Sequence, residues 1–368
     1  MIVAVLGAGH GGLATAGHLG LKGHEVRLFS FYRRETDPVR DRKGIRLEGG
    51  VEGVAPVARV ASGIDEAVAG AELIIAVTPA LAHRTLASLL APCLEDGQIL
   101  LLTPGRTGGA LEVYRELRRL QVRARAVVAE CQTLLYAAES RGPAHVEVMK
   151  VKHRVRAAAL PARDTSALMD AIGALYGEYV EAESVLETSL NNVGAVVHPA
   201  PMLLNSGLLE RAARGEDLRY YKDIITRFVC THVMERIDRE KSAVARAVGA
   251  KVLGALAWYE ECYGVTGGDL YEVLQKNPYY QGFSAPRHVL GYHHVLDEVP
   301  NSLVPLEAFG RAAGVATPTI SALVDLAGAS LEVDFRAEGR TLERLGLGGM
   351  GVEAVREFVT RGPRFWEP

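Results

Sequence analysis

Residues 2–14, IVAVLGAGHGGLA, carry three glycines spaced G-x-G-x-x-G between an apolar run of strand length and a helical pattern. In that context Gly7 permits a tight turn, Gly9 lets the backbone approach a pyrophosphate, and Gly12 lets the helix pack against the strand. The free N–H groups at the start of the helix would bind the phosphates. The alternative is a glycine-rich turn in another kind of α/β protein. We expect a dinucleotide-binding loop formed by Gly7, Ala8, Gly9, His10, Gly11 and Gly12.

The first half of the chain alternates short β-rich runs with helical patterns. Its continuous apolar runs are typical of buried parallel strands, because helices cover both faces of such strands. These runs lie at residues 2–7, 25–30, 73–78 and 98–105. Further β-rich runs, expected to extend the same sheet, lie at 125–130, 145–151 and 154–162. The pattern predicts a Rossmann-type, doubly wound α/β domain over residues 1–182.

The character of the sequence changes near residue 182. Strand-like runs give way to long helical patterns, as in residues 226–264 and, with an interruption, 318–360. The connection over residues 178–190 has a helical pattern rather than the composition of a flexible linker. An all-α domain over residues 183–368 is therefore expected to follow the α/β domain.

Composition argues against several classes of protein. The chain of 368 residues has a formal net charge of −3, which gives no electrostatic reason to expect nucleic acid or a membrane as a partner. No stretch approaches about 18 uninterrupted apolar residues, and the N-terminus lacks the basic region and cleavage site of a signal peptide. The widely spaced cysteines favour a reducing compartment over a disulfide framework or a zinc site. The expected location is the cytoplasm. The four cysteines are Cys93, Cys131, Cys230 and Cys262.

The end of the second predicted strand bears on the choice of cofactor. An NAD-binding domain places Asp or Glu there to bind the ribose 2′-hydroxyl, whereas this chain has Ser30 followed by Arg33 and Arg34. A hydroxyl and two guanidinium groups suit a 2′-phosphate, so NADP(H) is favoured. NAD(H) stays an alternative, because Glu35 could bind its ribose and the arginines could form a solvated face.

Two loops follow predicted strands at the sheet edge where ligands bind in open α/β domains. They are TPALAH at residues 78–83 and TPGRTGG at residues 103–109. We expect them to close around the nicotinamide ribose, with Thr78 and Pro79 among the contacts. Ordinary β–α turns are the alternative.

One imidazole, His198, interrupts the apolar run NNVGAVVHPAPMLLN at residues 191–205. By itself such a histidine is more often a satisfied core residue than a catalyst. It lies just past the predicted domain connection, however, where a ligand cleft is expected, and imidazole is well matched to proton transfer near neutral pH. We therefore predict that His198 handles the proton in a hydride transfer to a C=O or C=N group.

A catalytic imidazole needs an acidic partner that fixes its tautomer and stabilises its cationic form. Asp297 and Glu298, in GYHHVLDEVPNSLVP at residues 291–305, are the candidates, although acidic residues before such a turn are usually solvated. The adjacent His293 and His294 are not expected to bind a metal, because neighbouring rings rarely reach one ion and no third ligand is evident.

Over nearly its whole length the chain resembles the opine dehydrogenases of the octopine dehydrogenase family. The resemblance implies a helical C-terminal domain of the 6-phosphogluconate dehydrogenase type and a homodimer. It also implies NAD(P)H-dependent condensation of a 2-oxo acid with the amino group of an amino acid or amine. The motifs are GAGHGG, VAECQTLLYA, NNVGAVVHPAPMLLN, RYYKDIITRFV, IDREKSAVARAVG, WYEECYG, NPYYQGFSAP, DEVPNSLVPLEAFGRAAGVATPTI and DFRAEGRTLERLGLGGM.

The resemblance assigns proton transfer to His198 and makes an acidic residue of the DEVP segment its partner. The family's usual order there is Glu-Asp-Val-Pro, with Asp as the partner. That column holds Glu298 in this chain, and Asp297 precedes it. The family often has Asn four residues before the histidine, where this chain has Gly194.

Other positions bear on the substrate. Asn192 and Tyr221 are the predicted substrate contacts, although a helix cap or a buried aromatic residue would explain each equally well. The family's Arg-Tyr pair ahead of the acidic residues, suited to a substrate carboxylate, corresponds to His293 and His294. Two other functions remain open, namely a 2-oxo acid reductase of the ketopantoate reductase type and a non-catalytic NAD(P)-binding sensor. The former uses a catalytic lysine, and the helix bearing His198 has none.

Overall fold

The computed structural model describes residues 1–287 and 293–362, and the chain divides into two compact units. The first unit comprises Met1–Gly105 and Gly109–Val185, and the second comprises Arg106–Gly108 and Leu186–Pro368. A three-residue segment of the TPGRTGG loop thus belongs to the second unit, although the chain on both sides of it belongs to the first.

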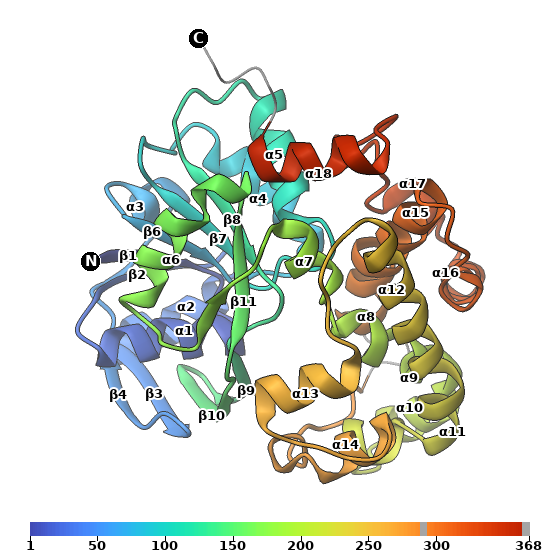
Figure 1. The fold of residues 1–368 in the computed structure, drawn as a ribbon. Helices are drawn as coiled ribbons and strands as arrows, with labels where there is room; N and C mark the ends of the chain where they lie inside the picture. Colours follow the sequence, from blue (N-terminus) through green and yellow to red (C-terminus); the bar gives the residue numbers. More distant parts are fainter. Residues whose placement is uncertain (288–292, 363–368) are drawn as a thin grey trace. The chain divides into compact units, whose positions relative to one another are not determined.

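The first unit is built around an eight-stranded sheet with the order β12-β11-β8-β7-β6-β1-β2-β5 (Figure 1). Its strands from β5 to β8 are parallel, and β11 runs antiparallel to β8. The strands are β1 (Ile2–Leu6), β2 (Glu25–Phe29), β5 (Arg59–Val60), β6 (Leu73–Ala76), β7 (Ile99–Leu102), β8 (Val127–Cys131), β11 (Val155–Leu160) and β12 (Tyr179–Glu181). The helices are α1 (His10–Leu21), α2 (Arg33–Arg42), α3 (Ile64–Val68), α4 (His83–Leu90), α5 (Gly109–Arg119) and α6 (Thr165–Gly173).

The central strands form because their apolar runs can be buried on both faces. Every residue of β6 and β7 is buried, and so are the last four residues of β1. The chain leaves β1 toward β2 on one side and reaches β6 on the other, so the strand order reverses at β1. Ligands of doubly wound sheets bind at the carboxyl edge of such a reversal. The predicted Rossmann-type domain is confirmed, and this edge positions its glycine loop.

One prediction about the sheet is wrong. Residues 145–151 do not extend the large sheet but form β10 (His145–Val151) in a second, four-stranded sheet of order β4-β3-β10-β9. The reason is visible in HVEVMKV, whose alternating pattern leaves only every second residue buried at its start, as in a strand with one solvated face. The other strands of this sheet, which packs on α1, are β3 (Gly44–Gly49), β4 (Gly53–Pro56) and β9 (Tyr136–Gly142).

The second unit is helical, as predicted. The connection near residues 178–190 is helical only in its second part, because β12 precedes α7 (Val185–Leu190). The following helices are α8 (Gly194–Val197), α9 (Pro199–Leu204), α10 (Ser206–Ala213), α11 (Arg227–Val229), α12 (Glu235–Ala247), α13 (Ala255–Tyr263) and α14 (Leu270–Lys276). The last helices are α15 (Val304–Ala312), α16 (Pro318–Leu331), α17 (Phe335–Glu338) and α18 (Val352–Arg361).

Two consecutive π-helical segments, η6 (His293–Asp297) and η7 (Val299–Leu303), flank Glu298 and lead into α15. Pro300 lies in η7 and has no N–H to donate to the regular α-helical pattern, which accounts for the wider turn. A second break separates α8 from α9, where Pro199 opens the new helix. Glu298 lies at the first of these two irregularities, and His198 lies at the second.

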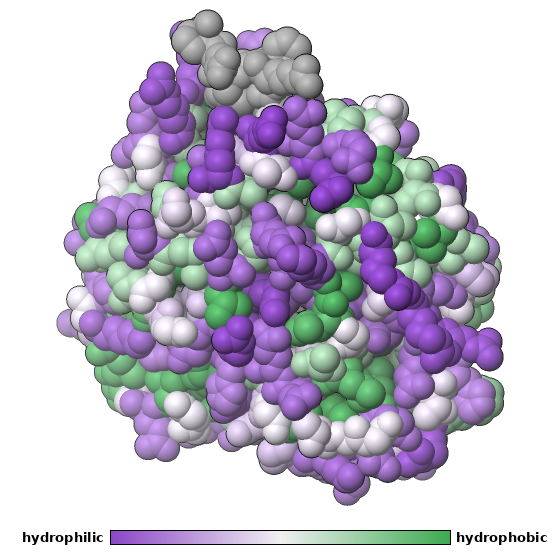
Figure 2. All heavy atoms as spheres, viewed as in Figure 1, coloured by the Kyte–Doolittle hydropathy of each residue, from purple (hydrophilic) through white to green (hydrophobic). Residues whose placement is uncertain are grey.

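The face of the molecule seen in Figure 2 is mainly polar. Figure 2 shows hydrophilic side chains over much of the visible face, with apolar residues in separate small patches. Among the described residues, no helix is both long enough and apolar enough to cross a membrane.

Candidate functional site

The glycine loop after β1 has a backbone that side chains would obstruct. Gly7 has φ +114°, and a Cβ there would overlap the carbonyl oxygen of Val77. A Cβ at Gly12 would overlap the carbonyl oxygen of Gly7, so this glycine lets α1 approach the turn closely. A Cβ at Gly9 would meet nothing within 4 Å. The middle glycine therefore borders open space, as a ligand-binding position would.

The groups around this space fit a phosphate-bearing dinucleotide. Gly9 is the residue that caps α1, and no side chain of its own satisfies the first N–H groups of the helix. Thr78, just past the end of β6, has a buried hydroxyl without a hydrogen-bond partner among the described residues. Pro79 follows it and opens the next short turn. The predicted loop residues and the predicted Thr78–Pro79 pair thus lie at the ends of neighbouring strands, β1 and β6.

The end of β2 carries a carboxylate as well as the predicted arginines. Ser30 Oγ donates a hydrogen bond of 2.6 Å to Oε2 of Glu35, so this carboxylate lies at the strand end. The side chains of Arg33 and Arg34, in the first turn of α2, are exposed. Both the hydroxyl and guanidinium groups suited to a 2′-phosphate and the carboxylate suited to a ribose are therefore present here.

His198 lies at the junction of α8 and α9 with its side chain 20% exposed, which distinguishes it from the fully buried residues around it. Its Nδ1 is 2.6 Å from Oε1 of Glu298. Since a carboxylate accepts, Nδ1 carries the proton of this bond. Nε2 has no hydrogen-bond partner among the described residues, and it is the ring atom through which His198 can exchange a proton with a substrate.

Glu298 lies at the centre of a larger group of interactions. Its side chain is fully buried, and Oε1 also lies 2.6 Å from Nη1 of Arg106. Oε2 accepts a hydrogen bond of 2.6 Å from Ser302, whose hydroxyl accepts one of 2.8 Å from Asn192. We call His198, Glu298 and Arg106 the His198 cluster.

The cluster keeps Glu298 ionised. Burial alone would raise the pKa of this carboxyl, but the Arg106 charge, the hydrogen bond and charge of His198, and the Ser302 hydroxyl together lower it to about 2. A buried carboxylate that remains charged at neutral pH can orient an imidazole and stabilise an imidazolium. The geometry is that of an oriented acid–base group.

Gly194 makes the Arg106–Glu298 contact possible. A Cβ at this position would overlap both Oε1 of Glu298 and Nη1 of Arg106. The residue that departs from the family pattern therefore lies where the guanidinium and the carboxylate meet. A larger side chain there would displace one of them.

The remaining predicted site residues take different positions. Asp297 is buried, with one carboxylate oxygen 3.6 Å from Nε of Arg106. The carboxylate that is hydrogen-bonded to Nδ1 of His198 is that of Glu298. Asn192 is buried, and both ends of its amide bind the protein, since Oδ1 accepts from the Gly194 N–H at 3.0 Å. Tyr221 stacks on Tyr280 with 3.9 Å between ring centroids. The predicted substrate contacts of Asn192 and Tyr221 stay predictions.

The sequence is closely similar to a curated enzyme. It is 38% identical over 357 residues to an opine dehydrogenase of Arthrobacter sp. (strain 1C), covering 97% of this chain and 98% of that protein. The chain belongs to the opine dehydrogenase family. Residues 181–331 of the chain match the family described as NAD/NADP octopine/nopaline dehydrogenase, alpha-helical domain. Residues 2–116 match the N-terminal part of NAD-dependent glycerol-3-phosphate dehydrogenases.

Solved structures show the same fold as this opine dehydrogenase family member. An octopine dehydrogenase in complex with NADH and agmatine has a TM-score of 0.74 at 20% identity, with 96% of this chain and 97% of that chain covered. A yersinopine dehydrogenase with bound NADP+ has a TM-score of 0.70 at 15% identity, with 93% and 94% covered. The fold and the family expected from the sequence are both confirmed.

Sequence reasoning missed Arg106 and Ser302. The loop that carries Arg106 was identified only as a candidate for cofactor binding, because it follows a strand of the α/β unit. Arg106 has φ +58°, a conformation uncommon outside glycine, and it directs its side chain to Glu298 in the second unit. Ser302 could have been found from the sequence. It lies four residues after Glu298, and residues four apart on a helical segment lie on one face.

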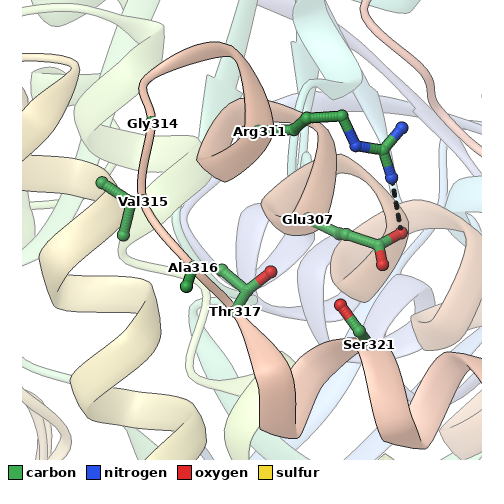
Figure 3. Close-up of a pocket in the computed structure, with 7 residues that line it drawn as sticks. All are labelled: Glu307, Arg311, Gly314, Val315, Ala316, Thr317 and Ser321. Atoms are coloured by element: carbon green, nitrogen blue, oxygen red, sulfur yellow. Dashed lines mark ion pairs between the residues drawn. The ribbon is translucent and has the colours of Figure 1, made fainter.

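This protein also has a hollow of about 310 Å³ between the end of α15 and the start of α16, lined by none of the site residues described above (Figure 3). The carboxylate of Glu307 in its lining lies 3.6 Å from Nη2 of Arg311 and receives two hydrogen bonds from Arg336. This carboxylate is neutralised within the protein. None of the three cluster residues lines the hollow, and we assign it no part in the site.

Among the described residues, no group of three or more His, Cys, Asp or Glu could hold a metal ion.

Proposed function

We propose that this protein joins a 2-oxo acid to the amino group of an amino acid or amine and reduces the resulting imine with NAD(P)H. The observation that carries the proposal is the 2.6 Å contact between His198 and the ionised, buried Glu298. Among the described residues, Nε2 of His198 has no hydrogen-bond partner. Family membership supports the reaction class, and a related octopine dehydrogenase has been solved with NADH and agmatine.

The residues of the second unit account for the proton steps. In the adduct of the two substrates, Nε2 of His198 donates the proton that lets the hydroxyl leave as water. Glu298 stabilises the imidazolium before this step and holds the ring in one orientation afterwards. Loss of water leaves an iminium that keeps the N–H of the adduct, so hydride on its carbon gives the secondary amine directly, and His198 regains its proton from solvent. Bound NAD(P)H would supply the hydride for the imine carbon.

The residues of the first unit would hold the dinucleotide. The turn at Gly7–Gly12 and the N-terminal N–H groups of α1 would bind the pyrophosphate, and the Thr78 hydroxyl would meet the nicotinamide ribose. We further propose that NADPH is preferred to NADH. Ser30, Arg33, Arg34 and Glu35 carry a net charge of +1 beside the ribose position, which favours a 2′-phosphate.

A two-substrate assay tests the reaction. The purified protein is incubated with NADPH or NADH, a set of 2-oxo acids that includes pyruvate, and a set of amino acids and amines. The proposal predicts cofactor oxidation only when an oxo acid and an amine are both present, with a secondary amine as the product by mass spectrometry. Oxidation with the oxo acid alone would instead identify a ketone reductase, and tight cofactor binding without turnover would identify a sensor.

The resemblance also suggests a homodimer located in the cytoplasm. Light scattering on the purified protein tests the first part, and fractionation of the source cells tests the second. A monomer at micromolar concentration would contradict the dimer.

A further inference from the structure

The proposed reaction sets a requirement for a cation at the site. A 2-oxo acid is anionic, and its carboxylate must be held while the neighbouring carbonyl carbon reacts at Nε2 of His198. Arg106 is the guanidinium that contacts the His198–Glu298 pair, and its side chain is 17% exposed. The following inference rests on the proposed function and names the residue that would hold this substrate.

The guanidinium of Arg106 is not fully used within the protein. Glu298 offers it a single oxygen, Oε1, because Oε2 is bound by Ser302. The contact with Glu298 is therefore one-sided, although Arg can present two parallel N–H donors to a carboxylate. Nε of Arg106 is buried without a hydrogen-bond partner among the described residues, with Asp297 3.6 Å away.

The position of Arg106 is set by the second unit. The Thr107 N–H donates to the carbonyl of Asn301 at 3.1 Å, and the Thr107 hydroxyl donates to the carbonyl of Ser189 at 3.1 Å. The Gly108 N–H donates to the Ser189 hydroxyl at 2.9 Å. These bonds hold the short segment beside Glu298, so Arg106 and His198 keep one mutual geometry.

Gly194 supplies the space for this arrangement. Without a side chain at this position, the guanidinium lies directly beside the backbone of α8 and next to Glu298. The chain thereby places the planar guanidinium of Arg106 beside His198 and Glu298, although Arg106 lies far from both in the sequence.

We propose that Arg106 binds the carboxylate of the 2-oxo acid and so orients the reacting carbonyl toward Nε2 of His198. One guanidinium then contacts two carboxylates, that of Glu298 and that of the substrate. Arg106 thereby contributes to recognition of the oxo acid.

The test uses Arg106→Gln in the full-length protein, with pyruvate and its neutral analogue pyruvamide. For pyruvate, we expect KM to rise about 10- to 100-fold, as for loss of a charge-assisted hydrogen bond. For pyruvamide and for the amine, KM should change less than about threefold, so the preference for the acid over the amide is lost. Arg106→Lys keeps the charge without the planar fork and should lie between the two. Arg214→Gln, whose side chain is 81% exposed, is the matched control.

A loss of kcat with the pyruvate preference intact would overturn the proposal, because Arg106 would then act only through Glu298. Binding of oxamate, a carboxylate that is not reduced, gives a readout that needs no turnover. Calorimetry with saturating cofactor should show affinity about 10- to 100-fold weaker in Arg106→Gln than in wild type. If the wild type turns over no pair of substrates, the proposed function fails, and equal oxamate binding in both proteins would separately overturn the role of Arg106. If Arg106→Gln does not fold, the Lys variant is measured in the same two ways.

Discussion

Nη1 of Arg106 and Nδ1 of His198 lie at the same distance, 2.6 Å, from one carboxylate oxygen of Glu298. Two groups that can carry positive charge therefore share one buried anion. The Ser302 hydroxyl occupies the other oxygen, so the carboxylate cannot rotate away from either partner without losing a hydrogen bond. Glu298 therefore contacts Arg106, His198 and Ser302 at once. Nε2 of His198 is the atom that we propose exchanges a proton with the substrate.

The stability of the protein should depend on pH through Glu298. Burial opposes ionisation, but Arg106, His198 and Ser302 lower the pKa of this carboxyl from 4.5 to about 2. Because the pKa is lower in the folded state, the stabilising contribution is present above pH 4.5 and is lost as the pH falls toward 2. Urea unfolding of wild type and Glu298→Gln should show a difference in unfolding free energy that is constant above about pH 5 and declines below it. A constant difference down to pH 3 would contradict this account, and Glu210→Gln, at an exposed position, is the control.

His198→Gln should lower turnover without releasing the cofactor. Loss of a positioned general acid costs about 10²- to 10⁴-fold in rate. The dinucleotide loop belongs to the other unit, so the dissociation constant for NAD(P)H, measured by fluorescence, should change less than about twofold. The control is His232→Gln, an exposed ring stacked on Phe228. Turnover of His198→Gln equal to that of the control would exclude His198 from the reaction.

The fold could be predicted where burial leaves a simple trace in the sequence. The apolar runs of β1, β6 and β7 predict parallel strands, and G-x-G-x-x-G predicts the turn after β1, because local sterics alone demand glycine there. The second sheet could not be predicted, because the sequence of β10 indicates a strand but does not indicate which strands pair with it. Which strand pairs with which depends on the packing of α1 against β3 and β9.

The site could be predicted only in part. His198 and Glu298 were candidates, and the structure brings them together, but the choice between Glu298 and Asp297 depends on which carboxylate the π-helical turns direct toward the ring. The sequence shows that Gly194 departs from the family pattern but does not show why. The reason is Arg106, and no local pattern indicates that its loop segment packs with the second unit.

Gly194→Ala should disturb the same contact as a change at Arg106. The added methyl group would overlap Glu298 and Arg106, so one of them must move. We expect kcat/KM for pyruvate to fall about tenfold or more, by analogy with loss of one charge-assisted bond. In an Arg106→Gln background the added effect should be much smaller, because the displaced group is already absent. Gly207→Ala, whose Cβ would meet nothing within 4 Å, is the control, and fully additive losses would show that the two positions act independently.

The glycines of the dinucleotide loop should separate folding from binding. Gly12→Ala brings a methyl group onto the carbonyl of Gly7 and should lower Tm by several degrees, as for a loss of about 1–3 kcal/mol. Gly9→Val faces open space, so Tm should stay near the wild-type value while the dissociation constant for NAD(P)H rises at least about tenfold through a clash with the pyrophosphate. Thermal unfolding and cofactor fluorescence measure the two effects. Normal cofactor affinity in Gly9→Val would place the pyrophosphate elsewhere.

Cofactor preference should depend on the residues at the end of β2. Glu35, held by Ser30 at 2.6 Å, opposes a 2′-phosphate, whereas Arg33 and Arg34 attract it. The double variant Arg33→Ala/Arg34→Ala should raise the dissociation constant for NADPH about 10- to 100-fold and that for NADH less than about threefold. Glu35→Gln should tighten NADPH binding, because it removes the negative charge and keeps an acceptor for Ser30. Arg40→Ala, farther along α2, serves as the control. Tighter binding of NADH than of NADPH by the wild type, with Glu35→Gln weakening NADH, would assign the site to NAD, since the carboxylate would then bind the ribose.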